Sequence, residues 1–218
     1  YRGRPVGSAS PVSCFSFNGN KLLTTGGGGA LVTNDEAVAR RAKYLTTQAK
    51  DDPVEFVHGD VGFNYRLTNI QAAMGCAPIE HLDAFVAAKR RIAERYAREL
   101  GDLPGFVPMR EAPWATSSFW MYTARIDADA FGMDSRALLA ALDARGIQAR
   151  PLWQPMHRSP AHRASWAAPC PVADRLYRDA ISLPCSTNLT DAQQTRVIAA
   201  VRSAAPGPAG RGAAAPAV

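Results

Sequence analysis

The chain has 218 residues and a formal net charge of +6, with 47% hydrophobic and 20% charged residues. These values are typical of a soluble globular protein, and the length suits one large domain or two small ones. No apolar run approaches the roughly 18–20 residues that a membrane-spanning helix needs, so we expect no membrane partner. The chain begins without Met and shows no secretion signal, which indicates a piece of a longer cytoplasmic protein.

The cysteines and the basic residues carry no specific functional signal. The basic run KRR at 89–91 is followed by Glu94, which indicates a solvated helix face and no nucleic-acid partner. No C-x-x-C pair occurs, so the cysteines are expected to be reduced thiols in the core rather than disulfides or metal ligands. They are Cys14, Cys76, Cys170 and Cys185.

The chain opens with two predicted strands and a helix. Short apolar segments over 12–17 and 29–34 are bounded by Gly, Asn and Asp, which is typical of buried strands. Asn34 or Asp35 then stands where a helix cap is expected, before a helix predicted over 36–45.

A loop and a long helix follow. Residues 46–66 show Pro, Gly and Asp punctuation and little periodicity, which predicts a long loop of the functional or disordered kind. Residues 68–100 keep helical spacing of apolar side chains and predict one long amphipathic helix. Pro78 interrupts that pattern, so we expect a kink or a split near Ala77.

The remaining residues predict a small α+β arrangement. We therefore divide the chain into a large-domain part over 1–104, a small domain over 105–204 and a disordered Ala/Gly/Pro tail over 205–218. The elements expected in the small domain are strands over 117–126, 147–153 and 181–184, and helices over 135–145, 172–180 and 191–202.

Lys21 stands out because the stretch SFNGNKLLTTGGGG places it between a small polar turn and four glycines. One explanation is a solvated lysine beside a glycine hinge. A phosphate-binding P-loop is excluded by the order of the residues, because that motif places its lysine after the glycines, whereas Lys21 precedes them. A third explanation is a Schiff-base lysine, which needs small neighbours and room for a planar cofactor. The residues around Lys21 are small, and Ser16 offers a hydroxyl for a phosphate oxygen.

The motif FSFNGNKLLTTGGGGALVTND, with TTQAKDDP, GFNYRLTNIQAAMG and RPLWQPMH farther along, resembles the DegT/DnrJ/EryC1/StrS family of sugar aminotransferases. The resemblance runs from about Arg4 to Val201. It implies an α/β fold: the C-terminal part of a fold type I transferase dependent on pyridoxal 5′-phosphate (PLP), with an incomplete large domain and a small α+β domain. SFNGNK and TTQAKDDP look closest to the subgroup acting on UDP-linked 4-keto-6-deoxy amino sugars.

The resemblance also implies roles for individual residues. Lys21 would bind PLP as a Schiff base and then carry the proton between the amino donor and the cofactor. Ser16 matches the family's phosphate-binding serine. Asn64 matches an asparagine that reaches the partner's cofactor phosphate, which implies a homodimer. Arg66 would order that loop or form a structural ion pair, and the glycines at 26–29 would allow close backbone approach, a tight turn, or both.

The implied reaction moves an amino group from an amino acid, with glutamate as the expected donor, to a nucleotide-linked keto sugar for surface polysaccharide or glycan synthesis. Related dehydratases carry histidine in place of the lysine, so Lys21 favours amino transfer. Trp153 and His157 lie in a segment that matches the sugar-nucleotide pocket, and a place in the small-domain core is the alternative. The four histidines lack ligand spacing, so no metal site is expected.

The sequence departs from the family pattern in two ways. The family's front half is absent, and with it the acidic residue that pairs with the pyridine nitrogen and the aromatic that stacks on the ring. Pro11 and Pro78 also stand where relatives have other residues. Two hypotheses remain open: a portion of an aminotransferase that is active when the front half is present, or a truncated non-catalytic remnant.

Overall fold

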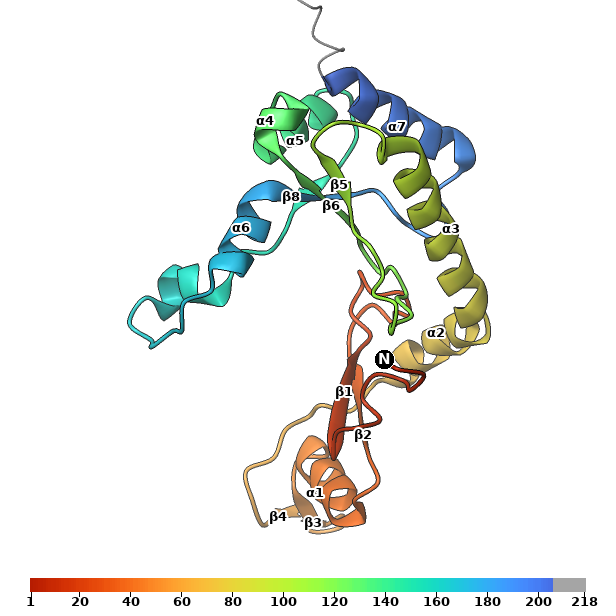
Figure 1. The fold of residues 1–218 in the computed structure, drawn as a ribbon. Helices are drawn as coiled ribbons and strands as arrows, with labels where there is room; N and C mark the ends of the chain where they lie inside the picture. The colour runs from red at the N-terminus through yellow and green to blue at the C-terminus, as the bar shows by residue number, and fades with distance from the viewer. Residues whose placement is uncertain (206–218) are drawn as a thin grey trace, which may run out of the picture. The chain divides into compact units, whose positions relative to one another are not determined.

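The computed structural model describes residues 1–205, which form two compact units. The first unit comprises residues 1–86 and 112–117, and the second comprises residues 87–111 and 118–205. Figure 1 gives the order of the elements along the chain. The boundary between the two compact units lies after residue 86. The domain boundary after residue 104, expected from the sequence, stays a prediction.

The first unit begins with an antiparallel pair of strands, β1 (Val12–Ser16) and β2 (Gly29–Thr33). Both strands were expected, and both form within one residue of the predicted bounds. Their predicted burial was wrong, because Phe15, Leu31 and Val32 are exposed in the chain described. Each strand has a single neighbour, so the two-stranded sheet covers neither of its own faces.

Helix α1 (Glu36–Thr46) follows β2 directly. The Asp35 carboxylate accepts hydrogen bonds from the backbone N–H groups of Ala37 and Val38, so Asp35 is the cap. The predicted loop after α1 contains a short hairpin of β3 (Lys50–Asp52) and β4 (Val57–His58), which the sequence analysis missed.

The predicted long helix is two helices, α2 (Asn69–Glu80) and α3 (Leu82–Leu100). The expected split near Ala77 was wrong in position, because the chain stays helical through Pro78 and breaks at His81. A proline removes one helical hydrogen bond, and here the helix ends within a turn of it, so the loss is confined to the last turn. Pro11 lies just before β1, where a proline costs no ladder hydrogen bond.

The second unit contains a four-stranded antiparallel sheet in the order β5-β6-β8-β7. Strands β6 and β7 are shorter than the sequence pattern suggested, β8 has the predicted length, and β5 was not predicted. Their bounds are Phe106–Pro108 for β5, Tyr122–Ile126 for β6, Arg150–Pro151 for β7 and Ala180–Leu183 for β8.

Helices accompany this sheet, and α3 and α7 run side by side (Figure 1). The Arg95 guanidinium of α3 donates hydrogen bonds to the Asp191 carbonyl and to the Thr195 hydroxyl of α7. The remaining elements are α4 (Ala128–Phe131), α5 (Ser135–Asp143), α6 (Pro171–Asp179), α7 (Asp191–Ala204) and two short 3-10 turns, η1 (Met156–Arg158) and η2 (Pro160–His162).

The apolar core of the described chain belongs to the second unit. The Tyr96 and Tyr122 rings lie 4.8 Å apart at its centre, and burial raises the pKa of both phenols above the usual range. Other fully buried side chains in this core are Leu100, Ile126, Phe131, Leu138, Leu142, Ile181 and Val201. The first unit has no comparable core, because Thr25 and Ala49 are the only buried residues among 1–86 and 112–117.

Two sequence-based expectations about side chains need correction. All four cysteines are free, but only Cys185 is buried, so the predicted core location was wrong for the other three. The KRR run was expected to be a solvated face, yet Lys89 is buried and Arg90 forms an ion pair with Glu111 at 2.8 Å. A helix face that packs against a sheet buries the side chains that point inward, whatever their charge.

No helix within residues 1–205 is long and apolar enough to cross a membrane. The predicted tail begins at residue 205, and its residues 206–218 lie outside the part of the chain that the structure describes.

The glycine at the start of β2 yields a stability prediction. A Cβ on Gly29 would collide with the backbone oxygen of Phe15, which cannot move without breaking the β1–β2 ladder. We expect Gly29→Ala to destabilise the hairpin by about 1–3 kcal/mol. Amide hydrogen exchange across β1 and β2 measures this. Gly19→Ala is the control, since a Cβ there meets nothing within 4 Å, and equal protection in both variants would contradict the prediction.

Candidate functional site

Lys21 lies in the loop that joins β1 to β2, and backbone hydrogen bonds close that loop at its base. The Phe17 N–H donates to the Gly28 carbonyl at 3.0 Å, and the Thr25 N–H donates to the Phe17 carbonyl at 3.0 Å. The Thr24 hydroxyl donates to the same Phe17 carbonyl at 3.0 Å. These hydrogen bonds hold residues 18–24 as a closed loop at the end of the hairpin.

Within the loop, Lys21 and Ser16 are the two chemically useful groups. The Lys21 backbone N–H donates to the Asn18 carbonyl at 2.9 Å, which tightens the turn, and the Lys21 side chain is half-buried. Ser16 is the last residue of β1 and is exposed, and its Oγ accepts a hydrogen bond from the Asn18 N–H at 3.3 Å. A primary amine and a hydroxyl are thus carried by one loop.

The glycine run has a structural explanation at two of its positions. Gly26 and Gly28 have φ angles of 76° and 81°, in the left-handed region that favours glycine. A Cβ on Gly28 would also lie 2.5 Å from Leu67 Cδ1. The expected tight turn is therefore confirmed, and the close approach at Gly28 is to a side chain of the same unit.

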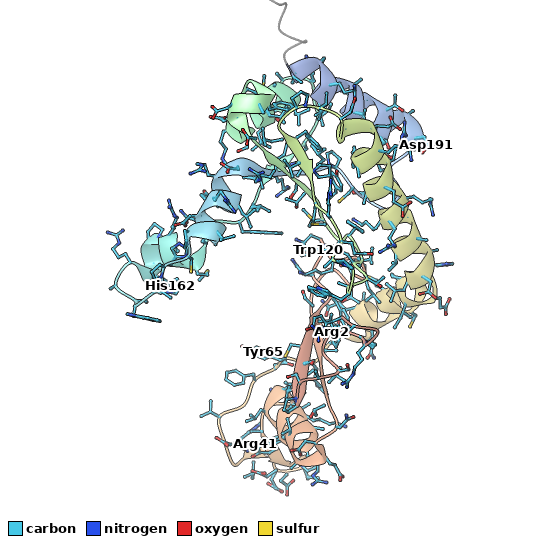
Figure 2. The ribbon with its side chains drawn as sticks, viewed as in Figure 1. Arg2, Arg41, Tyr65, Trp120, His162 and Asp191 are labelled. Carbon is cyan, nitrogen blue, oxygen red and sulfur yellow. The ribbon has the colours of Figure 1, made fainter. Side chains whose placement is uncertain are left out.

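The segment containing Asn64 runs beside these glycines. Asn64 is exposed and pairs with Thr47 through an isolated β-bridge. A surface hollow in the same unit is lined by Gly28, Gly29, Tyr65, Arg66, Leu67 and Gln71. Tyr65, labelled in Figure 2, is exposed on this segment.

Arg66 makes no ion pair with any residue in the described range 1–205. The expectation of a structural ion pair for Arg66 is therefore not met. Its guanidinium is exposed beside the glycine hollow, where it can attract an anion.

Trp153 and His157 belong to the second unit. Trp153 is 65% exposed, and its ring stacks on Trp120 with centroids 6.0 Å apart and planes inclined at 21°. Trp120 lies just before β6 (Figure 2). The alternative of a place in the small-domain core is thus wrong for Trp153 in this structure.

His157 is held by a carboxylate that the sequence analysis did not single out. Its Nε2 lies 2.8 Å from Asp174 Oδ1, and the Arg158 Nε donates to the same oxygen at 2.5 Å. His157 and Arg158 lie in η1 and Asp174 lies in α6, so no local motif connects them. Only the fold reveals this cluster.

The structure brings some of the predicted site residues together. Ser16 ends β1 and Lys21 lies in the loop that follows it, and the segment of Asn64 lies in the same unit. Trp153 and His157 share the other unit, within five residues of each other in the chain. Residues 1–205 contain no group of three or more His, Cys, Asp or Glu side chains that could hold a metal ion.

A model of the DegT/DnrJ/EryC1/StrS aminotransferase family matches residues 1–202. The chain belongs to this family. The expected resemblance is confirmed, and so is the cofactor, since the aminotransferases of this family depend on PLP. The fold is the expected mixed α/β one, and this chain covers 54% of each of two aminotransferases of known structure that it resembles.

Relatives of this family member act on different nucleotide sugars. GDP-perosamine synthase of Caulobacter vibrioides is 38% identical over 202 residues, which are 92% of this chain and 54% of that protein. The crystal structure of DesV from Streptomyces venezuelae is 34% identical with a TM-score of 0.82, covering 93% of this chain and 54% of that one. PseC from Helicobacter pylori, an aminotransferase of pseudoaminic acid biosynthesis, is 29% identical with a TM-score of 0.84, covering 94% and 56%.

The chain therefore spans about half the length of the curated relatives it matches. The residues present fit one side of PLP, because an amine on the Lys21 loop suits its carbonyl and the Ser16 hydroxyl suits its phosphate. Within residues 1–205, no carboxylate can be assigned to the pyridine nitrogen and no aromatic side chain to the ring face. The fit thus covers the lysine and phosphate sides of the cofactor.

The carboxylate that holds His157 yields a prediction about pH. Arg158, and after it His157, lower the pKa of Asp174 to about 2. A lowered pKa stabilises the folded state above the unfolded pKa of about 3.9, and this contribution disappears as the pH falls toward 2. We expect Arg158→Ala to raise the Asp174 pKa, measured by NMR titration of its carboxyl carbon.

Arg163→Ala is the matched control, because the Arg163 guanidinium donates to the Pro160 carbonyl and forms no ion pair within residues 1–205. It should leave the Asp174 pKa unchanged. An Asp174 pKa that does not rise in Arg158→Ala would show that the short Arg158–Asp174 contact does not persist in solution.

Proposed function

We propose that this chain is the lysine-bearing portion of an enzyme that transfers an amino group from an amino acid, with glutamate as the donor, to a nucleotide-linked 4-keto-6-deoxy sugar. The product would serve surface polysaccharide or glycan synthesis. The observation that carries the proposal is the closed loop that carries Lys21 and begins directly after Ser16. The proposal places the reaction in the cytoplasm, which the four free cysteines favour.

In this proposal Lys21 has two tasks. Its Nζ would hold PLP in the site. Its amine would also be the group that moves a proton at the donor's Cα. A short loop closed at its base suits this role, because the amine must return to one position at each step.

Ser16 and Asn64 would bind phosphate. The Ser16 hydroxyl donates to a phosphate oxygen, and its exposed position at the end of β1 leaves it accessible. The Asn64 amide would donate to the phosphate of the partner subunit in a homodimer, and the exposed Arg66 adds positive charge beside it. Asn64 and Arg66 belong to the same segment, which runs beside Gly28 and Gly29.

PLP, when bound, supplies an electron-accepting ring that stabilises negative charge at the donor's Cα. That function depends on an acidic partner for the ring nitrogen, which the described residues do not provide. Activity is therefore proposed for the whole protein, in which a further segment would complete the site.

Trp153 and His157 are the proposed contacts to the substrate. A tryptophan with one face stacked and the rest exposed can stack on a nucleotide base, and a histidine held by a carboxylate can bind a sugar hydroxyl or phosphate. The sequence suggests a UDP-linked sugar as the substrate. A GDP-linked sugar is the alternative, because the 38% identical relative is named for one.

The second candidate is a non-catalytic remnant of such an enzyme. The two unusual prolines do not strengthen it. Pro11 lies outside the ladder of β1 and Pro78 lies in the last turn of α2, so the fold accommodates both.

The role of Lys21 is tested by PLP titration of the full chain, followed by borohydride reduction and peptide mass mapping. We expect a visible absorption band and preferential labelling of Lys21. Lys21→Ala should lose both. Lys43→Ala, which removes another lysine of the same unit, should keep both. Labelling spread evenly over the lysines would favour the remnant.

The role of Trp153 is tested by calorimetric titration of the full chain with GDP, UDP and dTDP. Loss of one base–aromatic stack costs about 1–3 kcal/mol, so Trp153→Ala should weaken binding of the preferred nucleotide roughly 5- to 150-fold. Trp166→Ala is the control, since Trp166 is 90% exposed. Equal affinity in the two variants would remove Trp153 from the substrate site, and the ranking of the three nucleotides decides between UDP and GDP.

A further inference from the structure

The core of the second unit holds a lysine and a cysteine side by side. Lys89 of α3 and Cys185, two residues after β8, are each 7% exposed. The Lys89 Nζ lies 2.9 Å from the Trp120 carbonyl oxygen and 3.6 Å from the Cys185 Sγ. The fold thus brings a buried amine and a buried thiol into contact across 96 positions of the chain.

The Cys185 sulfur is surrounded by polar groups, among them the Trp120 carbonyl oxygen at 3.6 Å, to which the thiol donates. The Tyr122 backbone N–H donates to Cys185 Sγ at 3.4 Å, and the Lys89 amine approaches the sulfur as a second donor. The Tyr96 hydroxyl donates to the Pro184 carbonyl at 2.8 Å, which fixes the residue before Cys185. Nearby cations and N–H donors are what raises the reactivity of a cysteine.

The lysine has no acidic partner to hold its charge. None of the ion pairs within residues 1–205 includes Lys89. An ammonium group buried without a counter-charge is unfavourable. The contact between Nζ and Sγ places two atoms that can act as nucleophiles, one nitrogen and one sulfur, side by side.

We propose that Lys89 and Cys185 form a covalent link when the protein meets hydrogen peroxide. The Cys185 sulfur attacks peroxide and the O–O bond breaks; the departing hydroxide takes up the proton held between Sγ and Nζ, so a sulfenic acid, one water and a neutral Lys89 amine result. The neutral Lys89 amine then attacks Sγ: an S–N bond forms, the S–O bond breaks, and the departing hydroxide takes the amine proton as a second water. One thiol, one amine and one peroxide give one sulfenamide and two waters.

Lysine is the available partner because no second thiol is paired with Cys185. The other cysteines are exposed and none of the four is in a disulfide. The four-carbon stem of Lys89 can rotate to close the 3.6 Å gap, while the rigid sheet holds Cys185 in place. The link would tie α3 to the segment after β8 and close a long loop, which constrains the unfolded chain.

The test treats the full chain with hydrogen peroxide and digests it without reductant for mass spectrometry. The expected product is the Lys89 peptide joined to the Cys185 peptide, lighter by two hydrogens than their sum. Dithiothreitol should separate the peptides. The oxidised chain should also show an upward shift of its urea midpoint that dithiothreitol reverses.

Two variants locate the link. Lys89→Arg keeps the positive charge but replaces the amine with a weakly nucleophilic guanidinium, and it should abolish the joined peptides. Cys170→Ser removes an exposed thiol of the same unit and should leave them unchanged. The peptide map of the unaltered chain needs neither variant to fold.

Three results would overturn the proposal. Cys185 recovered as an unmodified thiol after oxidation of the exposed cysteines would show that peroxide does not reach it. Cys185 recovered as a sulfinic acid, with no joined peptide, would show that Lys89 does not capture the sulfenic acid. A joined peptide that retains an oxygen atom would exclude the S–N bond. None of these readouts depends on PLP or on aminotransferase activity.

Discussion

The site depends on the hydrogen bonds that Phe17 makes through its backbone. Its N–H and its carbonyl each bind the far side of the loop, at Gly28 and at Thr25, so β1 and β2 remain joined beyond the last ladder pair. Everything proposed for Lys21 requires this closure, because an amine on an open twelve-residue connection would sample many positions. The constraint lies in the main chain, and it therefore tolerates many side chains at residue 17 but few at the glycines opposite.

Stability and chemistry are distributed unequally over the chain. The apolar core lies in the second unit, whereas the lysine loop, residues 17–28, lies in the first unit, which buries little apolar surface. Elements with little burial open at lower free energy than the core, so the lysine loop should exchange its amide protons before the sheet of the second unit does. The lysine loop would therefore gain most from any additional segment that packs against β1 and β2.

Sequence reasoning worked where a signal was local. The cap at Asp35 and the glycine turn follow from short-range geometry, and the family resemblance rests on contiguous motifs. It failed where a property depends on what packs against an element. The strands β1 and β2 read as buried because their residues are apolar, yet burial needs a covering layer. Likewise Lys89 reads as solvated because it is charged, and its burial is set by the sheet beneath α3. The Asp174 carboxylate was missed for the same reason, because its partners lie in a different segment.

The contact between His157 and Asp174 determines what the other side of the imidazole can recognise. Because Asp174 accepts only from a protonated nitrogen, it selects the tautomer with hydrogen on Nε2 when the ring is neutral. The opposite nitrogen, Nδ1, then carries a lone pair and acts as an acceptor. That nitrogen would thus recognise a group that brings its own hydrogen, such as a sugar hydroxyl. One carboxylate in α6 therefore determines which kind of hydrogen-bonding partner the opposite edge of the ring can accept.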